Sequence, residues 1–452
     1  MRSCLIKPAS SGVGGRIILP GDKSIAHRAV ILSALSSGKT IIKNFPLNND
    51  LLTTVSAFRD LGVSIECPRK SGRTAAGVFV IVKGAGARGL KRPKKPINTG
   101  ESGTTIRLLS GLLCAQDFSS RLIAGKQLSG RPMSRITLPL RQMGAGITGK
   151  RASSAEEYPP LSIQPGRLRN ITYRMPVASA QVKSALLLAG LYCGGTTVVI
   201  EPVMTRDHTE RMLKMFGADI STGRCRGSYQ VKIRGGKFPV TPGVLAVPGD
   251  ISSAAFFLVF AVLCPGSKLV LERITLNPSR SGVLNVLKRM GADIRVNANK
   301  DKFSRSEPCG DIEARSSSLR GTIVRAGEIP SLIDELPVLM VAASLAKGVT
   351  IFKKVDELKY KETDRIRSMC GNLRLMGARC EVRERGGGTD IAIEGVKNLA
   401  GRSLKSYGDH RTAMSLFVAA SCARGESVID DISCAAKSLP GFLEYMRAVS
   451  SV

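Results

Sequence analysis

The chain of 452 residues is long enough for two or three domains, each with its own hydrophobic core. Hydrophobic residues make up 43% of it and Trp is absent, which indicates an α/β protein with an aliphatic core and excludes a disordered chain. Lys and Arg outnumber Asp and Glu by 67 to 35, giving a formal net charge of +32. Such a chain attracts nucleic acid, acidic lipid or a small acidic substrate, and because the basic residues are scattered the charge alone does not choose among these partners.

The cysteines and the apolar runs narrow the class of protein further. The 11 cysteines include no C-x-x-C pair, which argues against a structural zinc site and against a disulfide framework, and which fits a reducing cytosol. We therefore expect a cytoplasmic protein without a bound metal. The longest apolar run, residues 254–264, is too short to cross a bilayer, and we expect it to form a buried helix.

One pattern recurs six times along the chain: a turn rich in Gly, Ser or Asp precedes an apolar, Ala-rich helix. The period is about 77 residues, and a fixed period of this kind predicts repeated supersecondary units. Because the helices that follow the turns are almost entirely apolar, we expect them to be buried on all sides. The six turns lie at residues 21–24, 100–104, 178–181, 249–253, 330–334 and 408–411.

A second marker follows in step with the first. In five of the six copies an amphipathic helix ends at a Gly in the C′ position, and a strand begins directly after it. Each unit therefore reads as strand, turn, helix, strand, helix, strand, and three units per globular half is the natural grouping. The Pro/Gly segment around residues 238–248 is the expected crossover between the halves. The five glycines are Gly62, Gly144, Gly217, Gly291 and Gly377.

The turns carry the polar residues that could perform chemistry. At the first turn Lys23 and Ser24 precede a helix N-terminus, and Arg28 lies one helical turn further on, so these groups suit a phosphate or a carboxylate. If the six turns converge between the two halves, they bring together many cations and a few carboxylates. That combination suits two anionic substrates and acid–base chemistry.

Two nucleotide-binding patterns are rejected on their context. Residues 33–40 end like a P-loop, but they lack its first Gly and follow a helix instead of a strand. Residues 84–89 match G-x-G-x-x-G, but prolines interrupt the stretch where a helix would have to follow.

The motifs at the turns, taken together and in order, resemble those of the 5-enolpyruvylshikimate-3-phosphate (EPSP) synthase family. The resemblance implies an α/β fold of two domains, an inside-out α/β barrel with six βαβαββ repeats, three per domain. It places residues 1–20 with 248–452 in one domain and residues 21–247 in the other, with the active site in the cleft between them. The motifs are Gly21-Asp22-Lys23-Ser24 with Arg28, Gly103-Thr104, Arg131-Pro132, Ser179-Ala180-Gln181, Lys361-Glu362-Thr363-Asp364-Arg365 and Asp409-His410-Arg411.

The resemblance also implies the reaction and its substrates. The enolpyruvyl group of phosphoenolpyruvate passes to the 5-hydroxyl of shikimate 3-phosphate by addition and elimination through a tetrahedral intermediate, and phosphate is released. No cofactor or metal is implied, and we expect a monomer. Shikimate 3-phosphate would be bound by Lys23, Ser24, Arg28, Ser179, Gln181, Thr205, Arg206, Asp334 and Lys361. Phosphoenolpyruvate would be bound by Lys23, Gly103, Arg131, Gln181, Arg365, Arg411 and Lys437.

Three catalytic residues are implied in the same way. Asp334 would be the base at the 5-hydroxyl, and Glu362 with Lys23 would handle the proton at the enol carbon. Two carboxylates in different surroundings can serve such a pair of proton transfers. Glu362 has basic neighbours in sequence, whereas Asp334 follows the apolar Leu332 and Ile333. His410 is expected to support the site without touching substrate.

Two other functions are the alternatives. Enolpyruvyl transfer to UDP-N-acetylglucosamine uses the same fold and a loop Cys near the second turn, but here Cys114 falls inside an apolar helix. A nucleic-acid-binding or RNA-end-modifying protein would place aromatic residues among its basic ones, and only 4% of this chain is aromatic. The chain also departs from the resembled family at Glu101, where Asn is expected, and at Ala26, Ala180 and Lys359.

Overall fold

The computed structural model describes residues 3–68, 78–151, 156–225, 227–299, 307–385 and 387–450. The chain divides into two compact units, unit 1 (Met1–Asp22 with Pro248–Val452) and unit 2 (Lys23–Val247). It therefore passes from one unit to the other twice, after Asp22 and after Val247. No helix within the described ranges is long and apolar enough to cross a membrane.

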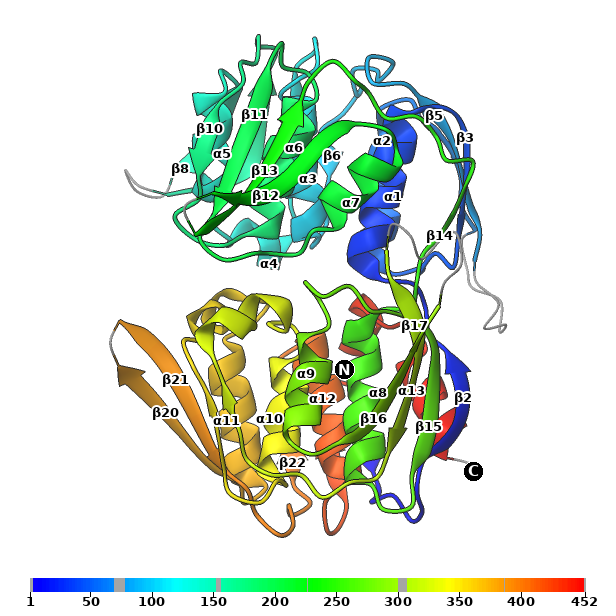
Figure 1. Ribbon diagram of the computed structural model, residues 1–452, viewed down its shortest axis with the longest axis vertical. Coiled ribbons are helices and arrows are strands. Elements are labelled where there is room, and N and C mark those ends of the chain that lie inside the picture. The colour runs from blue at the N-terminus through cyan, green and yellow to red at the C-terminus, as the bar shows by residue number, and fades with distance from the viewer. Residues whose placement is uncertain are drawn as a thin grey trace. The chain divides into compact units, whose positions relative to one another are not determined.

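Unit 2 contains three successive βαβαββ repeats, as the sequence predicts (Figure 1). Its helices are α1 (Lys23–Leu35), α2 (Asn49–Asp60), α3 (Gly103–Leu113), α4 (Lys126–Ser129), α5 (Ser134–Gln142), α6 (Ala180–Gly190) and α7 (His208–Met215). Its strands are β3 (Ser37–Lys43), β4 (Ser64–Glu66), β5 (Val80–Ala85), β6 (Ile97–Asn98), β7 (Ser120–Ile123), β8 (Gly146–Arg151), β9 (Glu157–Gln164), β10 (Thr172–Arg174), β11 (Thr196–Glu201), β12 (Asp219–Cys225), β13 (Ser228–Arg234) and β14 (Val244–Ala246).

Unit 1 is built in the same way from the remaining repeats. Its helices are α8 (Ile251–Leu263), α9 (Gly282–Arg289), η2 (Ala326–Ser331), α10 (Leu336–Ser344), η3 (Asp356–Tyr360), α11 (Arg365–Leu375), α12 (His410–Ser421), η4 (Ser433–Lys437) and α13 (Phe442–Ser450). Its strands are β1 (Cys4–Ile6), β2 (Gly14–Ile18), β15 (Lys268–Thr275), β16 (Asp293–Ala298), β17 (Cys309–Arg315), β18 (Ile323–Val324), β19 (Val349–Phe352), β20 (Arg379–Arg385), β21 (Gly388–Glu394), β22 (Ser403–Leu404) and β23 (Ser427–Ile429).

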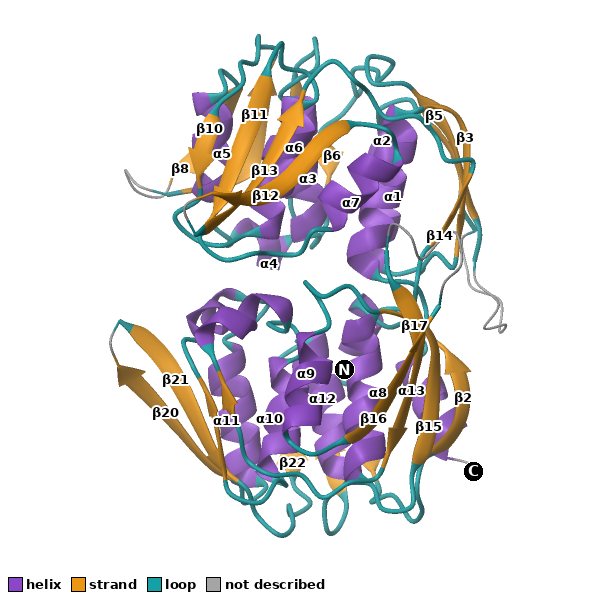
Figure 2. Ribbon diagram, in the orientation of Figure 1, coloured by secondary structure: helices purple, strands orange, loops and turns teal. Residues whose placement is uncertain are grey.

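Among the described residues the strands form six sheets, three in each unit; five of them have four strands arranged in the same way, and the sixth, β1-β23-β22, has three. In the sheet β6-β7-β9-β8, for example, β6 is parallel to β7, while β9 is antiparallel to both β7 and β8. Helices lie in the middle of each unit and sheets cover its outside (Figure 2). The predicted α/β class and its inside-out arrangement of helices within sheets are therefore confirmed.

Strands from distant parts of the chain complete three of the sheets. β2 leads into α1 but pairs with β15 of unit 1, and β14 leads into α8 but pairs with β3 of unit 2. The sixth repeat ends in a helix and has no closing strands of its own. Its sheet, β1-β23-β22, is completed by β1 from the opposite end of the chain. Sequence periodicity predicts the repeats but not these exchanges.

The first helix of each repeat is buried on nearly all sides, as predicted. Every residue of α10 is buried, as are all but one residue of α8 and α12. In α1, α3 and α6 the less buried residues lie at the N-terminal end, where the predicted site residues stand. The five C′ glycines all adopt positive φ angles, from 83° to 97°. The terminal helix begins at Phe442 rather than at Leu439, because Pro440 and Gly441 (φ 80°) interrupt it.

Candidate active site

In unit 1 a single buried guanidinium collects three carboxylates. Arg365 opens α11, and its Nε donates to Asp409 Oδ2 at 2.9 Å. Its Nη1 lies 3.5 Å from Asp334 Oδ1, and its Nη2 donates to Glu362 in a short hydrogen bond. Burial opposes the charged form, but Asp409, Glu362 and Asp334 outweigh it and raise the pKa of Arg365 above its ordinary value. Arg365 thus brings together the two carboxylates that the sequence predicts to be catalytic.

Asp334 lies among guanidinium groups from three different repeats. Besides Arg365, Arg280 Nη1 lies 3.9 Å and Arg411 Nη2 lies 3.7 Å from Asp334 Oδ2. Arg411 Nη1 also donates to the Asp334 backbone carbonyl at 3.0 Å. The apolar residues that precede Asp334 in sequence therefore do not form its surroundings. Asp334 thus stands among three positive charges, each within 4 Å of its carboxylate.

The carboxylates of this cluster differ in their access to solvent. The side chain of Asp409 is fully buried, because it caps α12 by accepting from the backbone N–H groups of Arg411 and Thr412. The side chains of Asp334 and Glu362 are 16% and 28% exposed. Asp334 and Glu362 can therefore reach a ligand, whereas Asp409 serves to hold Arg365 and the start of α12.

His410 and Lys437 stand beside this cluster at the sixth turn. Burial lowers the pKa of His410 to about 3, so its imidazole is neutral, and Nδ1 has no hydrogen-bond partner among the described residues. Lys437, at the end of η4, donates from Nζ to the backbone carbonyl of Gly408 at 3.1 Å. Its local sequence carries little information, but the fold brings it to the turn that holds Arg411.

In unit 2 the residues of the first turn are held by neighbours from other repeats. Lys23 forms a close ion pair with Asp50 in the first turn of α2. Arg28 is buried and donates from Nε to Thr209 Oγ1 at 2.6 Å, from Nη1 to the Ser24 carbonyl at 2.8 Å and from Nη2 to Ser184 Oγ at 2.8 Å. The fold therefore fixes Arg28 against α6 and α7 and places Asp50 as the partner of Lys23.

The second and third turns meet at a small group of polar side chains. Arg107 Nη1 donates to Gln181 Oε1 at 2.7 Å, and Gln181 Nε2 donates to Thr104 Oγ1 at 3.1 Å. A Cβ added at Gly103 would lie 3.0 Å from Arg107 Nη1 and 3.4 Å from Arg131 Nη1. Gly103, Arg131 and Gln181, which were predicted to bind one substrate, therefore lie together, and the absent side chain of Gly103 leaves room for two guanidinium groups.

Glu101 holds the segment that leads to Arg131. Its Oε1 accepts from the backbone N–H of Gln127 at 3.2 Å and its Oε2 accepts from that of Leu128 at 2.8 Å. These are the first N–H groups of the short helix α4, which would otherwise lack acceptors. The family departure at this position therefore has a structural role in this chain.

Thr205 is bound to a buried charged triad. Its backbone N–H and its hydroxyl both donate to Glu201 Oε2, the first at 3.1 Å and the second in a short hydrogen bond. Lys183 Nζ lies 2.8 Å from Glu201 Oε1 and 2.6 Å from Glu210 Oε1, and all three charged side chains are buried. Because the hydroxyl of Thr205 already donates its hydrogen bond to Glu201, Thr205 can act toward a ligand only as an acceptor.

The other predicted residues lie at the starts of helices or beside them and are partly exposed. Ser179 caps α6 by accepting from the Val182 N–H at 3.4 Å. Ser24 lies in the first turn of α1, Arg206 lies in the loop before α7, and Lys361 follows η3. Each unit thus assembles its own set of the predicted residues at helix N-termini.

Several contributors were not predicted from the sequence. They are Asp50, Glu201 and, above all, Arg280, which contacts Asp334. A comparison of the repeats could have found Arg280, because repeats 2, 3 and 5 also carry an Arg at or shortly before α5, α7 and α11: Arg131, Arg206 and Arg365. Asp50 and Glu201 carry no comparable signal.

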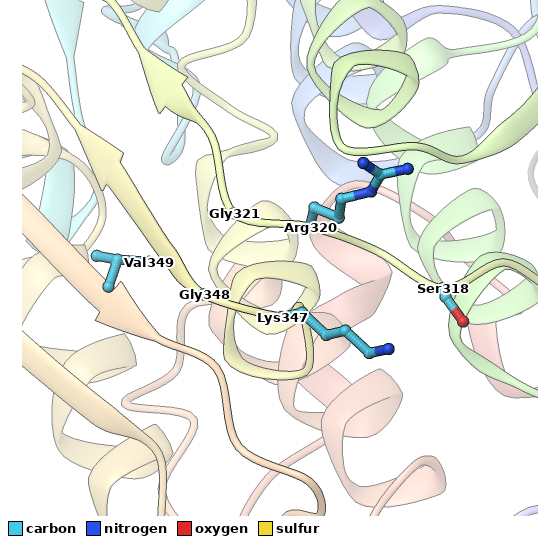
Figure 3. A pocket seen from close by; sticks show the side chains of 6 residues that line it. All are labelled: Ser318, Arg320, Gly321, Lys347, Gly348 and Val349. Atoms are coloured by element: carbon cyan, nitrogen blue, oxygen red, sulfur yellow. The ribbon is translucent and has the colours of Figure 1, made fainter.

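Unit 1 has a hollow of about 630 Å³ whose lining residues are not those of the candidate site (Figure 3). Arg320 and Lys347 on its rim are both exposed, and none of the predicted site residues lines it. It is lined by Ser318, Arg320, Gly321, Lys347, Gly348 and Val349.

Comparisons with known proteins agree along the whole chain. Residues 8–446 match the family model described as EPSP synthase (3-phosphoshikimate 1-carboxyvinyltransferase). The chain is 44% identical over 450 residues to the 3-phosphoshikimate 1-carboxyvinyltransferase of Bacillus thuringiensis (strain Al Hakam), with 100% of both chains covered. A solved EPSP synthase from Acinetobacter baumannii superposes with a TM-score of 0.85 at 40% identity, covering 99% of this chain and 98% of that one. The enolpyruvyl transferase NikO from Streptomyces tendae shares the fold, with a TM-score of 0.75 at 17% identity over 99% of this chain and 97% of that one.

Proposed function

The chain belongs to the EPSP synthase family, and from that premise we propose how its residues carry out the reaction. The reaction transfers the enolpyruvyl group of phosphoenolpyruvate to the 5-hydroxyl of shikimate 3-phosphate and releases phosphate. Both substrates carry a phosphate and a carboxylate, and the arginines and lysines at the helix N-termini supply the opposite charges. We propose that the residues of the two units act together on one pair of substrates.

Shikimate 3-phosphate is bound in this proposal by Lys23, Ser24, Arg28, Ser179, Gln181, Thr205, Arg206, Asp334 and Lys361. Ser24 and Ser179 are only partly buried and lie at the N-termini of α1 and α6, which supports this assignment because N–H groups at helix starts bind phosphate. Arg28 and Thr205 contribute from fixed positions, since Thr209, Ser184 and Glu201 already hold them.

Phosphoenolpyruvate is bound by Lys23, Gly103, Arg131, Gln181, Arg365, Arg411 and Lys437. The contact distances at Gly103 support this assignment, because they place the guanidinium of Arg131 beside a position without a side chain. Arg365 and Arg411 both lie within 4 Å of Asp334, so the proposed anion site and the proposed base adjoin.

In the addition step Asp334 accepts the proton of the 5-hydroxyl as that oxygen bonds to the central carbon of phosphoenolpyruvate. Glu362, assisted by Lys23, delivers a proton to the methylene carbon, which gives the tetrahedral intermediate. In the elimination step the methyl carbon returns a proton to Glu362, and the bond between the central carbon and the phosphate oxygen breaks with its electrons going to phosphate. The phosphate leaves with the proton that Asp334 had accepted, so both carboxyl groups regain their starting states. The observation that carries the proposal is the guanidinium of Arg365, which joins the two accessible carboxylates.

The test is phosphate release from the two substrates, with the wild type beside Lys23→Ala and Glu362→Gln. Release that requires both substrates and falls by about 100-fold or more in each variant supports the reaction and the roles. Release that survives both substitutions contradicts the roles but not the reaction. If the wild type releases no phosphate, a UDP-amino sugar and RNA become the substrates to test. Lys83→Ala, in which an exposed sheet lysine is removed, is the matched control.

We further propose that the protein works in the cytoplasm. The 11 cysteines are free thiols, and thiols without a disulfide suit a reducing compartment.

A further inference from the structure

Arg280 lies in a buried cluster of carboxylates in unit 1, and the reaction described above assigns it no role. Its side chain is only 2% exposed. Nη2 lies 3.2 Å from Asp22 Oδ2 and 3.3 Å from Asp250 Oδ1, and it donates to Ser252 Oγ at 2.8 Å. Nη1 lies 3.7 Å from Glu335 Oε1 and 3.9 Å from Asp334 Oδ2. One guanidinium thus faces four carboxylates that come from three separate parts of the chain.

Two of these carboxylates mark the points where the chain leaves unit 1 and returns to it. Residues 20–22 and 248–250, here called the crossover segments, pair with each other through their backbones. Asp22 N–H donates to the Pro248 carbonyl at 2.7 Å, and Asp250 N–H donates to the Pro20 carbonyl at 3.1 Å. Unit 2 begins at Lys23, directly after Asp22, so Arg280 binds the last residue before the proposed catalytic lysine.

The crossover segments are tightly packed at this point. A Cβ at Gly249 would lie 2.7 Å from Ile274 Cδ1, so the backbone approaches β15 more closely than a side chain would allow. Gly249 N–H also donates to the Arg273 carbonyl at 2.8 Å. The side chains of Asp22 and Asp250 therefore meet Arg280 from a fixed backbone.

The other two carboxylates belong to the start of α10. Asp334 is the proposed base, and Glu335 forms a short hydrogen bond with Ser252, which in turn accepts from Arg280. Within the described residues Arg280 Nη1 makes no hydrogen bond, so it holds Asp334 and Glu335 by charge. Arg280 thus lies within 4 Å of carboxylates on both crossover segments and of the proposed base.

Charge balance shows why a cation is needed here. Asp22 and Glu335 are fully buried and Asp250 is nearly so, and buried carboxylates require a paired cation. Burial and the charge of Asp22 raise the pKa of Asp250 to about 6, even though Arg280 and Arg411 oppose that shift. Without Arg280 the cluster would hold still more uncompensated negative charge.

The repeats supply a second and independent observation. A cation stands at or shortly before the second helix in repeats 2, 3, 5 and 6, at Arg131, Arg206, Arg365 and Lys437. Each of these is proposed above to bind a substrate. Arg280 holds a similar place in repeat 4, two residues before the first residue of α9, but its guanidinium is buried against the crossover segments. Repeat 4 therefore also has a cation at this place, but the cation pairs with buried carboxylates of the protein itself.

We propose that Arg280 is a positioning residue for enolpyruvyl transfer, which fixes the carboxylate of Asp334 relative to the two crossover segments. The inference rests on the proposed function, because Asp334 matters here as the base. Arg280 does not bind substrate in this proposal, so its loss affects turnover and leaves substrate affinity almost unchanged.

The test compares Arg280→Met and Arg280→Lys with the matched control Arg289→Met. Arg289 lies at the C-terminal end of α9, whereas Arg280 precedes the N-terminal end of the same helix, and Arg289 pairs with Glu328 on the surface. We expect kcat to fall by about 100-fold in Arg280→Met, because a small displacement of a reacting group has an effect of that order. KM for both substrates should change by less than about threefold, and Arg280→Lys should recover part of kcat, because an ammonium keeps the charge but not the planar fork. Unchanged kcat in Arg280→Met, or raised KM with normal kcat, would overturn the proposal.

A second variant covers the case in which Arg280→Met does not fold. Adding Asp22→Asn and Asp250→Asn to it removes the two crossover carboxylates together with their cation, so that the buried cluster holds less unpaired negative charge than in Arg280→Met. We expect this triple variant to fold and to keep the low kcat, since Asp334 still lacks its anchor. A triple variant with the kcat of the wild type would refute the positioning role.

Amide hydrogen exchange separates this inference from the proposed function. The N–H groups of Asp22 and Asp250 should exchange at least about tenfold faster in Arg280→Met than in Arg289→Met, because their carbonyl partners are no longer held in place. Unchanged exchange would overturn the anchoring role even if the wild type proved inactive with both substrates. Faster exchange together with an inactive wild type would leave the anchor standing and contradict the reaction alone.

Discussion

Replacing Lys183 by Met removes the only cation of a triad that is fully enclosed in unit 2. The ammonium lies 2.8 Å from Glu201 and 2.6 Å from Glu210, and none of the three side chains is more than 3% exposed. Burial opposes the charge of Lys183, but Glu210 and Glu201 outweigh it and raise its pKa. Breaking a buried pair in this way costs about 3–5 kcal/mol, because the remaining carboxylates have neither water nor a cation.

The cost should shrink when one carboxylate is removed as well. Burial already raises the pKa of Glu210, which makes Glu210 the carboxyl to neutralise when the cation is gone. We expect Lys183→Met with Glu210→Gln to recover about 1–3 kcal/mol relative to Lys183→Met, which is the range of coupling found for residues in contact. Lys214→Met, on the exposed face of α7, is the matched control and should change stability by less than about 0.5 kcal/mol.

Urea unfolding measures these differences. Far-UV circular dichroism and tyrosine fluorescence should be followed together, because the chain has seven tyrosines and no tryptophan. The reasoning is refuted if Lys183→Met costs less than about 1 kcal/mol, or if the double variant is less stable than the single one. The single variant should also raise KM for shikimate 3-phosphate, since Glu201 holds Thr205 in place.

Three further predictions concern the helix N-termini. Gly103→Ala should raise KM for phosphoenolpyruvate by about tenfold, because the added methyl group would lie 3.0 Å from Arg107 Nη1 and displace the guanidinium groups. An unchanged KM in steady-state assays would contradict this. Glu101→Ala should lower the free energy of unfolding by about 1 kcal/mol, and Glu101→Gln should lower it by less because Gln keeps one acceptor for the start of α4. Equal thermal stability of the two variants would count against the capping role. Burial lowers the pKa of His410 from 6.5 to about 3. Between these two pH values the imidazole is protonated in the unfolded chain but not in the folded one. The free energy of unfolding should therefore fall by about 1.4 kcal/mol per pH unit as the pH drops from 6.5 to about 3. His410→Gln should lack this component of the pH dependence, and parallel stability curves for the two proteins would show that the imidazole is not held neutral.

The repeat pattern predicted much of this fold because it depends on local sequence. Apolar runs predicted the buried helices, and glycines at C′ positions predicted where the amphipathic helices end. The strand exchanges could not be predicted, because β2 and β14 look like the first strands of their own repeats and only their distant partners decide which sheet they join. The completion of the sixth sheet by β1 is a long-range pairing of the same kind.

In the candidate site, too, local sequence predicted some residues, whereas contacts between distant parts of the chain could not be predicted. Motifs at the turns identified Asp334, Glu362 and Arg365, and the structure joins them through ion pairs. The three cations around Asp334 come from three repeats, so its neighbours in sequence gave no indication of them. The hydrogen bond between Thr205 and Glu201 could not be predicted either, because Glu201 ends a strand and its carboxylate is buried. The substrate-binding roles stay predictions until they are tested.

The two passages of the chain between the units have a consequence for biosynthesis. On the ribosome β1 and β2 emerge before any of their partners exist. β2 needs β15, which follows about 250 residues later, and β1 needs β23, which follows more than 400 residues later. At about 5–20 residues per second, β1 waits on the order of tens of seconds, during which all of unit 2 has been made and can fold. Unit 2 can therefore fold before unit 1 is complete. β2 can pair once β15 has been translated, whereas β1 becomes ordered only after almost the whole polypeptide has been made.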